Sequence, residues 1–91
     1  MRQTVFLILK RKKVIIMNTI PTVNMTATGK NITALRKKAG MTVRDVQNIF
    51  GFANPQAIYN WQNGSAMPTI DNMVILAALF DVTIDTIVIR N

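Results

Sequence analysis

Residues that begin and end helices recur at short intervals from residue 28 to the end of the chain. A Thr or Asn directly before an apolar run caps the free N–H groups of a first helical turn, and a Gly directly after it accepts the left-handed conformation in which many helices end. The starts are Thr42, Asn54, Thr69 and Thr83, and the stops are Gly40, Gly51 and Gly64. This punctuation leaves room only for short helices and short loops, and it predicts an all-α domain of five helices.

The apolar residues between these signals follow the helical repeat. Ile32, Leu35 and Ala39 are spaced i, i+3, i+7 in the first segment. The segment that follows Thr69 is apolar on nearly every side, which predicts the central buried helix. The last segment, "VTIDTIVI", is rich in β-branched residues and would also suit a strand, but its Thr cap and short connection favour a helix.

The third segment, "NPQAIYNWQNG", carries no charged residue. Asn54 followed by Pro55 is a strong helix start, since Pro at the first helical position needs no N–H partner. Ile58 and Trp61 lie on one side of this helix and are predicted to be core residues, although a lone Trp can also stack on bases. Gln56 and the residue four positions on, Asn60, share the other side.

The composition excludes most catalytic chemistry. The chain has no Cys, no His and no Glu, and its four acids are all Asp. Thiolate metal sites and disulfides are therefore impossible, and the usual general bases are missing. Because 49% of the residues are apolar, a core is nevertheless available. We expect a protein that is not an enzyme and binds no cofactor.

The net charge of +7 is concentrated near the N-terminus. Residues 1–16 contain five basic residues and no acid, whereas residues 17–91 contain six basic residues against four Asp, a net charge of only +2. Since most of the excess lies outside the helical region, it is weak evidence that the folded part binds nucleic acid. We interpret residues 1–27 as a flexible N-terminal tail and residues 28–91 as the folded domain.

The beginning of this tail, "MRQTVFLILKRKKVIIM", is neither a secretion signal nor a membrane span, because "KRKK" interrupts its short apolar runs. Two interpretations stay open. The tail is an arm for a membrane surface or nucleic acid, or translation begins at Met17 and the purine-rich Lys and Arg codons upstream are a ribosome-binding site.

Several motifs stand in a familiar order. They are Leu35-Arg36, Gly40-Met41-Thr42, Gly51, Ile58 with Trp61, Gly64 with Pro68-Thr69, and "VTIDTI". Together they resemble the lambda-repressor-like, Cro-type (XRE) family of helix-turn-helix regulators, over roughly residues 28–89. The resemblance implies a five-helix DNA-binding domain with its helix-turn-helix unit at about residues 42–63.

Three departures from the family pattern affect the turn and its supports. The turn "GFAN" is one residue longer than usual, which should change how the third helix is aimed. Gln47 replaces a small residue, and Gln62 replaces a Glu that commonly pairs with the Arg of the first helix, here Arg36. An Arg36–Gln62 hydrogen bond can substitute, though without charge assistance. The loop "SAM" also lacks the cations that relatives place on phosphates.

The resemblance places helix 54–63 in the major groove of DNA, where Asn and Gln bind adenine bidentately. The predicted base-contacting residues are Asn54, Gln56, Tyr59 and Asn60. The predicted phosphate contacts are Thr42, Arg44, Asn63, Ser65, Lys37 and Lys38, of which the two Lys are equally well read as a solvated face. Ile58, Trp61, Arg36 and Gln62 are predicted to be structural.

The resulting prediction is a cytoplasmic, sequence-specific transcriptional regulator that binds double-stranded DNA. We expect neither a membrane nor a small-molecule ligand. A homodimer through the C-terminal helix is expected, because Ile87, Val88 and Ile89 cannot all face one small core. The alternatives are an antitoxin-like or other protein-interaction module of the same fold, and a membrane-surface adaptor that uses residues 5–17.

Overall fold

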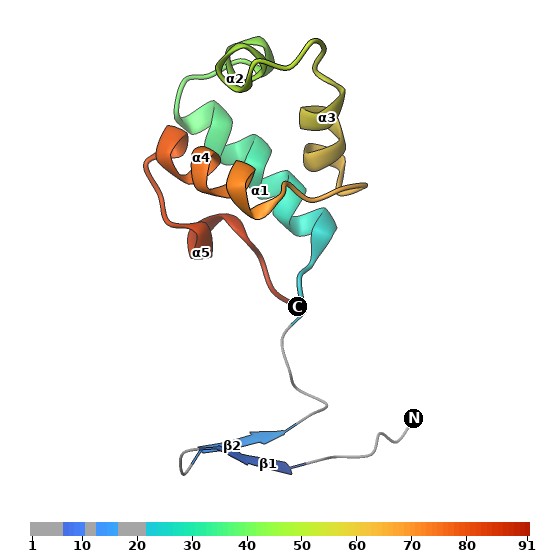
Figure 1. Cartoon of the computed structure of the whole chain (residues 1–91), viewed down its shortest axis with the longest axis vertical. Coiled ribbons are helices and arrows are strands. Elements are labelled where there is room, and N and C mark those ends of the chain that lie inside the picture. The colour runs from blue at the N-terminus through green and yellow to red at the C-terminus, as the bar shows by residue number, and fades with distance from the viewer. Residues whose placement is uncertain (1–6, 11–12, 17–21) are drawn as a thin grey trace.

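The computed structural model describes residues 7–10, 13–16 and 22–91. Five α-helices follow a short antiparallel β-hairpin (Figure 1). The elements are β1 (Leu7–Lys10), β2 (Lys13–Ile16), α1 (Met25–Lys38), α2 (Val43–Phe50), α3 (Gln56–Asn63), α4 (Ile70–Phe80) and α5 (Ile84–Ile87). The predicted all-α, five-helix domain is confirmed, with every helix in the predicted order.

The helices pack around α1 and α4 at the centre of the domain, with α2 above them, α3 on the right and α5 at the lower left (Figure 1). Within the described part of the chain, no helix is long and apolar enough to cross a membrane.

The helical domain begins earlier than the sequence analysis proposed. Asn24 caps α1 by accepting a hydrogen bond from the Ala27 N–H at 2.9 Å, so the helix starts at Met25 rather than near residue 28. The residues before it are also paired, because Val23 forms a β-bridge with Arg90. The last part of the predicted flexible tail, from Thr22 onward, is thus integrated into the domain.

The C-terminal residues pack back on the domain. After α5 the chain runs extended beside the start of α1, and the Asn24 N–H donates to the Ile89 carbonyl at 2.8 Å. The Thr28 hydroxyl, which is fully buried, accepts from the Ile89 N–H at 2.9 Å. Ile87 lies in the core, and Val88 is half-buried. The free apolar surface expected at the C-terminus is therefore largely covered by the chain itself.

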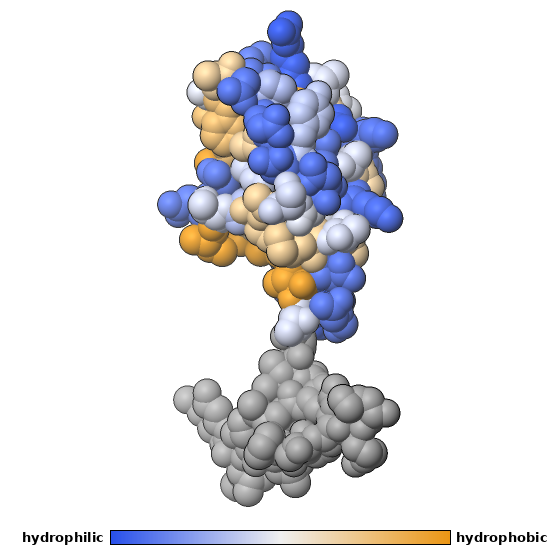
Figure 2. All heavy atoms as spheres, turned by 90° about the vertical axis from the view of Figure 1, so that its right-hand side faces the viewer, coloured by the Kyte–Doolittle hydropathy of each residue, from blue (hydrophilic) through white to orange (hydrophobic). Residues whose placement is uncertain are grey.

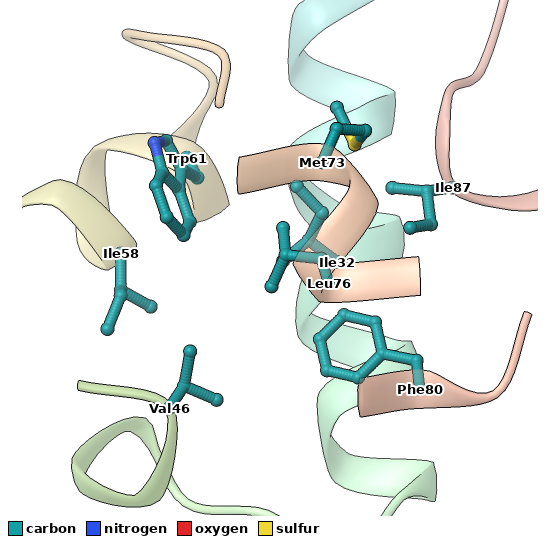
Figure 3. Close-up of a cluster of buried hydrophobic side chains, with 8 residues drawn as sticks. All are labelled: Ile32, Val46, Ile58, Trp61, Met73, Leu76, Phe80 and Ile87. Atoms are coloured by element: carbon teal, nitrogen blue, oxygen red, sulfur yellow. The ribbon is translucent and has the colours of Figure 1, made fainter. Parts of the chain in front are cut away.

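One hydrophobic core joins all five helices (Figure 3). Its buried members come from α1, α2, α3, α4 and α5 and point toward one another. They are Ile32, Val46, Ile58, Trp61, Met73, Leu76, Phe80 and Ile87. The core positions of Ile58 and Trp61 agree with the prediction, and burial of the indole, which is 4% exposed, excludes it as a platform for stacking bases.

The N-terminal strands were not predicted. β1 and β2 pair in the register Leu7 with Ile16 and Lys10 with Lys13. Residues 1–6, 11–12 and 17–21 lie outside the described residues, so the rest of the predicted tail and the proposed start at Met17 are not addressed by the structure.

Candidate nucleic-acid interface

The first helix of the helix-turn-helix unit, α2, begins with a capping box. The Asp45 N–H donates to the Thr42 hydroxyl at 3.0 Å, and the Asp45 carboxylate accepts from the Thr42 N–H at 2.8 Å. Hydrogen bonds that the Asp45 carboxylate accepts from Thr42 lower the pKa of Asp45, and the bond from the backbone N–H of Thr42 is the larger cause. Arg44 is exposed beside this cap. The cap fixes the end of α2, and Arg44 extends from that end.

The turn between the two helices is held by Gln47. Gly51 ends α2 in the left-handed conformation, at φ 73°, and the Phe52 N–H then donates to the Gln47 carbonyl at 3.1 Å. In return, the Gln47 side-chain amide donates to the Phe52 carbonyl at 3.2 Å. Gln47 therefore bonds both the N–H and the carbonyl of Phe52, and the bond to the carbonyl requires the Gln side chain.

An aromatic cluster anchors this turn to the core. The ring of Phe52 stacks on that of Phe50 at a centroid distance of 5.1 Å, and the edges of both meet Trp61 at 5.9 and 5.4 Å. Edge-to-face and offset-stacked rings attract beyond the area that they bury. Phe52 of the turn is thus packed against Trp61 of α3.

The second helix of the unit, α3, begins one residue later than predicted. Its first residue is Gln56, and Pro55 makes no side-chain cap. Asn54 instead accepts a hydrogen bond from the Gln56 N–H at 3.0 Å, which is an Asx turn leading into the helix. Asn54 therefore satisfies a free N–H of the first turn, as expected, although it stands two residues before the first residue of the helix and not directly before it.

The two sides of α3 differ in the predicted way. Ile58 and Trp61 are buried, whereas Gln56 and Tyr59 are exposed and Asn60 is half-buried. Figure 2 looks onto the side of the molecule that carries α3, and the surface there is mostly hydrophilic. The amide groups are therefore accessible to a ligand along this helix.

Gln56 and Asn60 are hydrogen-bonded to each other. The Gln56 side-chain amide donates to the Asn60 carbonyl oxygen at 2.9 Å. The Gln56 carbonyl oxygen and the Asn60 amide nitrogen remain for other partners. Together the two side chains still offer an acceptor oxygen and amide N–H donors, and these are the groups that adenine complements with its N6 and N7 atoms.

A hollow of about 400 Å³ brings together two of the predicted base-contacting residues and one predicted phosphate contact. It lies between α2 and the beginning of α3, and Arg44, Asn54 and Tyr59 all line it. A cation, an amide and an aromatic hydroxyl thus converge on one depression next to the exposed amides of α3.

The remaining predicted phosphate contacts are dispersed. Asn63 and Ser65 are exposed at the end of α3, where the Ser65 N–H donates to the Asn63 side chain at 2.9 Å. Lys38 lines a separate hollow with Phe80 and Asp81, and no α3 residue takes part in it. Lys37 is exposed on α1. Lys38 is therefore not brought together with the α3 amides.

The position of α3 depends on Arg36. Its Nε donates to the Gln62 side-chain oxygen at 2.9 Å, and its Nη1 donates to the Met41 carbonyl at 2.8 Å. The hydrogen bond to Gln62 predicted from the sequence is thus present. Because Met41 precedes α2, one buried guanidinium ties together α1, α3 and the start of the helix-turn-helix unit.

A supporting residue that the sequence analysis missed is Gly29 on α1. A Cβ atom at this position would meet the carbonyl oxygens of Trp61 and Gln62, the second at 2.5 Å. Only Gly allows the end of α3 to approach α1 this closely. A Gly inside a helix is a signal of close packing, but its partner cannot be inferred from sequence spacing.

These features define a helix-turn-helix domain. A family model described as helix-turn-helix (HTH_3) matches residues 32–87, which is more than half of the chain. The chain therefore belongs to the lambda-repressor-like, Cro-type (XRE) helix-turn-helix family, a family of DNA-binding regulators. No curated protein and no solved structure matched the chain.

Proposed function

We propose that this protein is a sequence-specific transcriptional regulator that inserts α3 into the major groove of double-stranded DNA. The observation that carries the proposal is the division of α3 into a buried side, with Ile58 and Trp61, and an accessible side, with Gln56 and Asn60. The core fixes the helix, and the amides are left for base edges.

The chemistry of the accessible side favours adenine. Asn and Gln donate to adenine N7 and accept from its N6 amino group, and a good bidentate pair discriminates by about 1–3 kcal/mol. The bonded Gln56–Asn60 pair offers this donor and acceptor from two residues at once. Asn54 and Tyr59 flank it and are proposed to contact neighbouring bases.

Phosphate contacts are proposed at the edges of this surface. Arg44 is the strongest candidate, because it is exposed and lines the hollow next to Asn54 and Tyr59. Thr42, Asn63 and Ser65 can offer hydrogen bonds to the backbone on either side of the groove. Phosphate contacts orient the protein on the duplex without conferring sequence preference.

Specific binding by such a domain generally needs two copies on half-sites about 34 Å apart. We therefore propose that the protein acts as a dimer on a pseudo-palindromic site in the cytoplasm. A dimer contact through the C-terminal helix was predicted from the sequence, but Ile87 of α5 lies in the core.

Selection of bound sites from random DNA, followed by binding measurements on variants, tests the proposal. Gln56→Ala and Asn60→Ala should each relax the preference at particular base positions. Arg44→Ala should weaken all sequences equally and reduce the slope of log affinity against log salt by about one unit. Enrichment of no sequence, or identical behaviour of the two kinds of variant, would refute the assignment of α3.

A further inference from the structure

The outward face of α4 is apolar. Ile70, Asp71, Val74, Ile75 and Ala78 are all exposed and share one side of the helix, and Asp71 is the only polar residue among them. The exposed fractions of Ile70, Val74 and Ile75 are 69%, 54% and 39%. Since helices at the surface of small domains normally turn polar residues outward, a contiguous apolar face of this kind marks an interaction site. We call these five residues the α4 face.

The α4 face lies to one side of the proposed DNA-contacting surface. In Figure 1, α4 is in front of α1 and α3 lies to the right. In Figure 2, which looks onto the α3 side, hydrophobic residues gather toward the left edge of the domain, the side that faces the viewer of Figure 1. A partner on the α4 face can therefore be bound while α3 occupies the major groove.

The α4 face carries one charged residue, Asp71, and the C-terminal part of the domain to which it belongs has a negative net charge. Residues 64–91, which include α4 and α5, contain three Asp and one Arg, a net charge of −2. Residues 22–63 contain five basic residues and one Asp, a net charge of +4. The part of the domain that carries the α4 face is thus acidic, and it suits a partner that is both apolar and basic.

The N-terminal segment of this chain has that composition. Residues 1–16 carry five basic residues and no acid, and six of the eight residues in β1 and β2 are Leu, Ile or Val. An isolated two-stranded hairpin is at best marginally stable in water, so such a segment gains stability from an apolar surface to pack on. The α4 face offers that surface with the complementary charge.

The same charges argue against contact between two α4 faces. Direct pairing would bring one segment of net charge −2 against another, with Asp71 on both faces, and like charges across an interface oppose association. The α4 face is also exposed in a single copy of the chain, so it is available to a second one. Reciprocal exchange of N-terminal segments would close a two-fold dimer, in which each copy contributes the same two surfaces.

We propose that the α4 face binds the N-terminal segment, residues 1–16, of a second copy of this chain. The dimer forms without DNA, so its test is independent of the proposed regulatory function. The test is analytical ultracentrifugation of the full chain without DNA at low salt, with circular dichroism to verify that each variant is folded.

Two variants and one control probe the contact. Val74→Arg places a cation on the exposed α4 face and should raise the dimer dissociation constant at least about tenfold. The second variant changes Lys10, Arg11, Lys12 and Lys13 to Glu, outside the helical domain, and should have the same effect. Ile49→Arg is the matched control, because Ile49 is similarly exposed but lies on α2. It should leave the dimer intact.

Combination of the two changes gives the decisive result. Val74→Arg and Asp71→Lys make the α4 face basic, and joined to the four Glu substitutions they should restore the dimer. A monomeric wild-type protein would overturn the proposal, as would a failure of this restoration. Loss of the dimer in Val74→Arg with no effect of the four Glu substitutions would instead assign the α4 face to self-contact.

Discussion

Arg36 holds Gln62 by a hydrogen bond of 2.9 Å from Nε to the side-chain oxygen, and this bond joins the first helix to the end of the third. Arg36 is buried, and its Nη1 is used by the Met41 carbonyl. The guanidinium is therefore satisfied by neutral acceptors alone among the described residues, in a place where the family commonly provides a carboxylate.

We predict that Gln62→Glu stabilises the domain. A carboxylate in this position would accept a charge-assisted hydrogen bond, which is about twice as strong as a neutral one, so the free energy of unfolding should rise by about 1 kcal/mol. Gln62→Leu should lower it by about 1–3 kcal/mol, because Arg36 Nε would lose its partner. Urea unfolding followed by Trp61 fluorescence measures both changes.

Gln56→Glu is the control for the added charge, because it lies on the same helix but makes no contact with Arg36. It should change the free energy of unfolding by only about 0.3 kcal/mol. The gain from Gln62→Glu should also shrink as the pH falls below about 4.3, the ordinary pKa of Glu, and be lost as the pH falls through the lower pKa of the folded state. An equal gain in both variants would show that Arg36 is not the cause.

Gly29 is predicted to be essential for the packing of α3 on α1. Gly29→Ala places a Cβ against two backbone carbonyls, which cannot move away as a side chain can, so we expect a loss of about 3 kcal/mol in the free energy of unfolding. Gly40→Ala is the control: its Cβ would meet no atom within 4 Å, and only the left-handed backbone at φ 74° opposes it. That variant should lose about 1 kcal/mol. Equal losses in thermal or urea unfolding would contradict the close approach.

The helices were predictable because their signals are local. Caps such as Thr42 and Thr83 act on N–H groups within three residues, and the helical repeat identifies Ile58 and Trp61 as core residues without knowledge of their partners. The Arg36–Gln62 bond could be predicted only through the family resemblance, since nothing local connects residues 26 positions apart.

The missed features depend on distant parts of the chain. Val23 pairs with Arg90, and the N–H of Asn24 donates to the Ile89 carbonyl, so the start of the domain is determined by its last residues. Gly29 approaches Trp61 and Gln62 for a reason visible only when α3 is in place. The candidate site was predictable in its α3 residues, whereas the hollow that joins Arg44 to Tyr59 follows from the crossing of two helices.

The capping box of α2 predicts a pH dependence of stability. The hydrogen bonds from Thr42 lower the pKa of Asp45 below its ordinary value of 3.8, so the charged carboxylate is favoured in the folded state. Its contribution is complete above that ordinary value and is lost as the pH falls through the lower pKa of the folded state. Asp45→Asn should therefore be less stable than the wild type at pH 7, and the difference should shrink below pH 3.8.

Urea unfolding of both proteins between pH 7 and about pH 2 measures this difference. Thr42→Ala removes the other half of the box and should cost about 1 kcal/mol at pH 7. A difference between wild type and Asp45→Asn that stays constant down to the lowest pH would mean that the Asp45 carboxylate does not support the cap.

The Gln56–Asn60 pair is predicted to act on DNA as one unit. Because the Gln56 amide donates to the Asn60 oxygen at 2.9 Å, removal of either side chain frees the other to turn away from the base. Gln56→Ala and Asn60→Ala should therefore relax preference at the same base position, and the double variant should lose less binding free energy than the two single losses together. We expect a coupling energy of about 1 kcal/mol, measured as a double-mutant cycle on a site selected from random DNA.

Arg44→Ala combined with Gln56→Ala is the control pair and should be additive within about 0.5 kcal/mol. Additive losses for Gln56 and Asn60, at two different base positions, would show that the two amides contact bases independently.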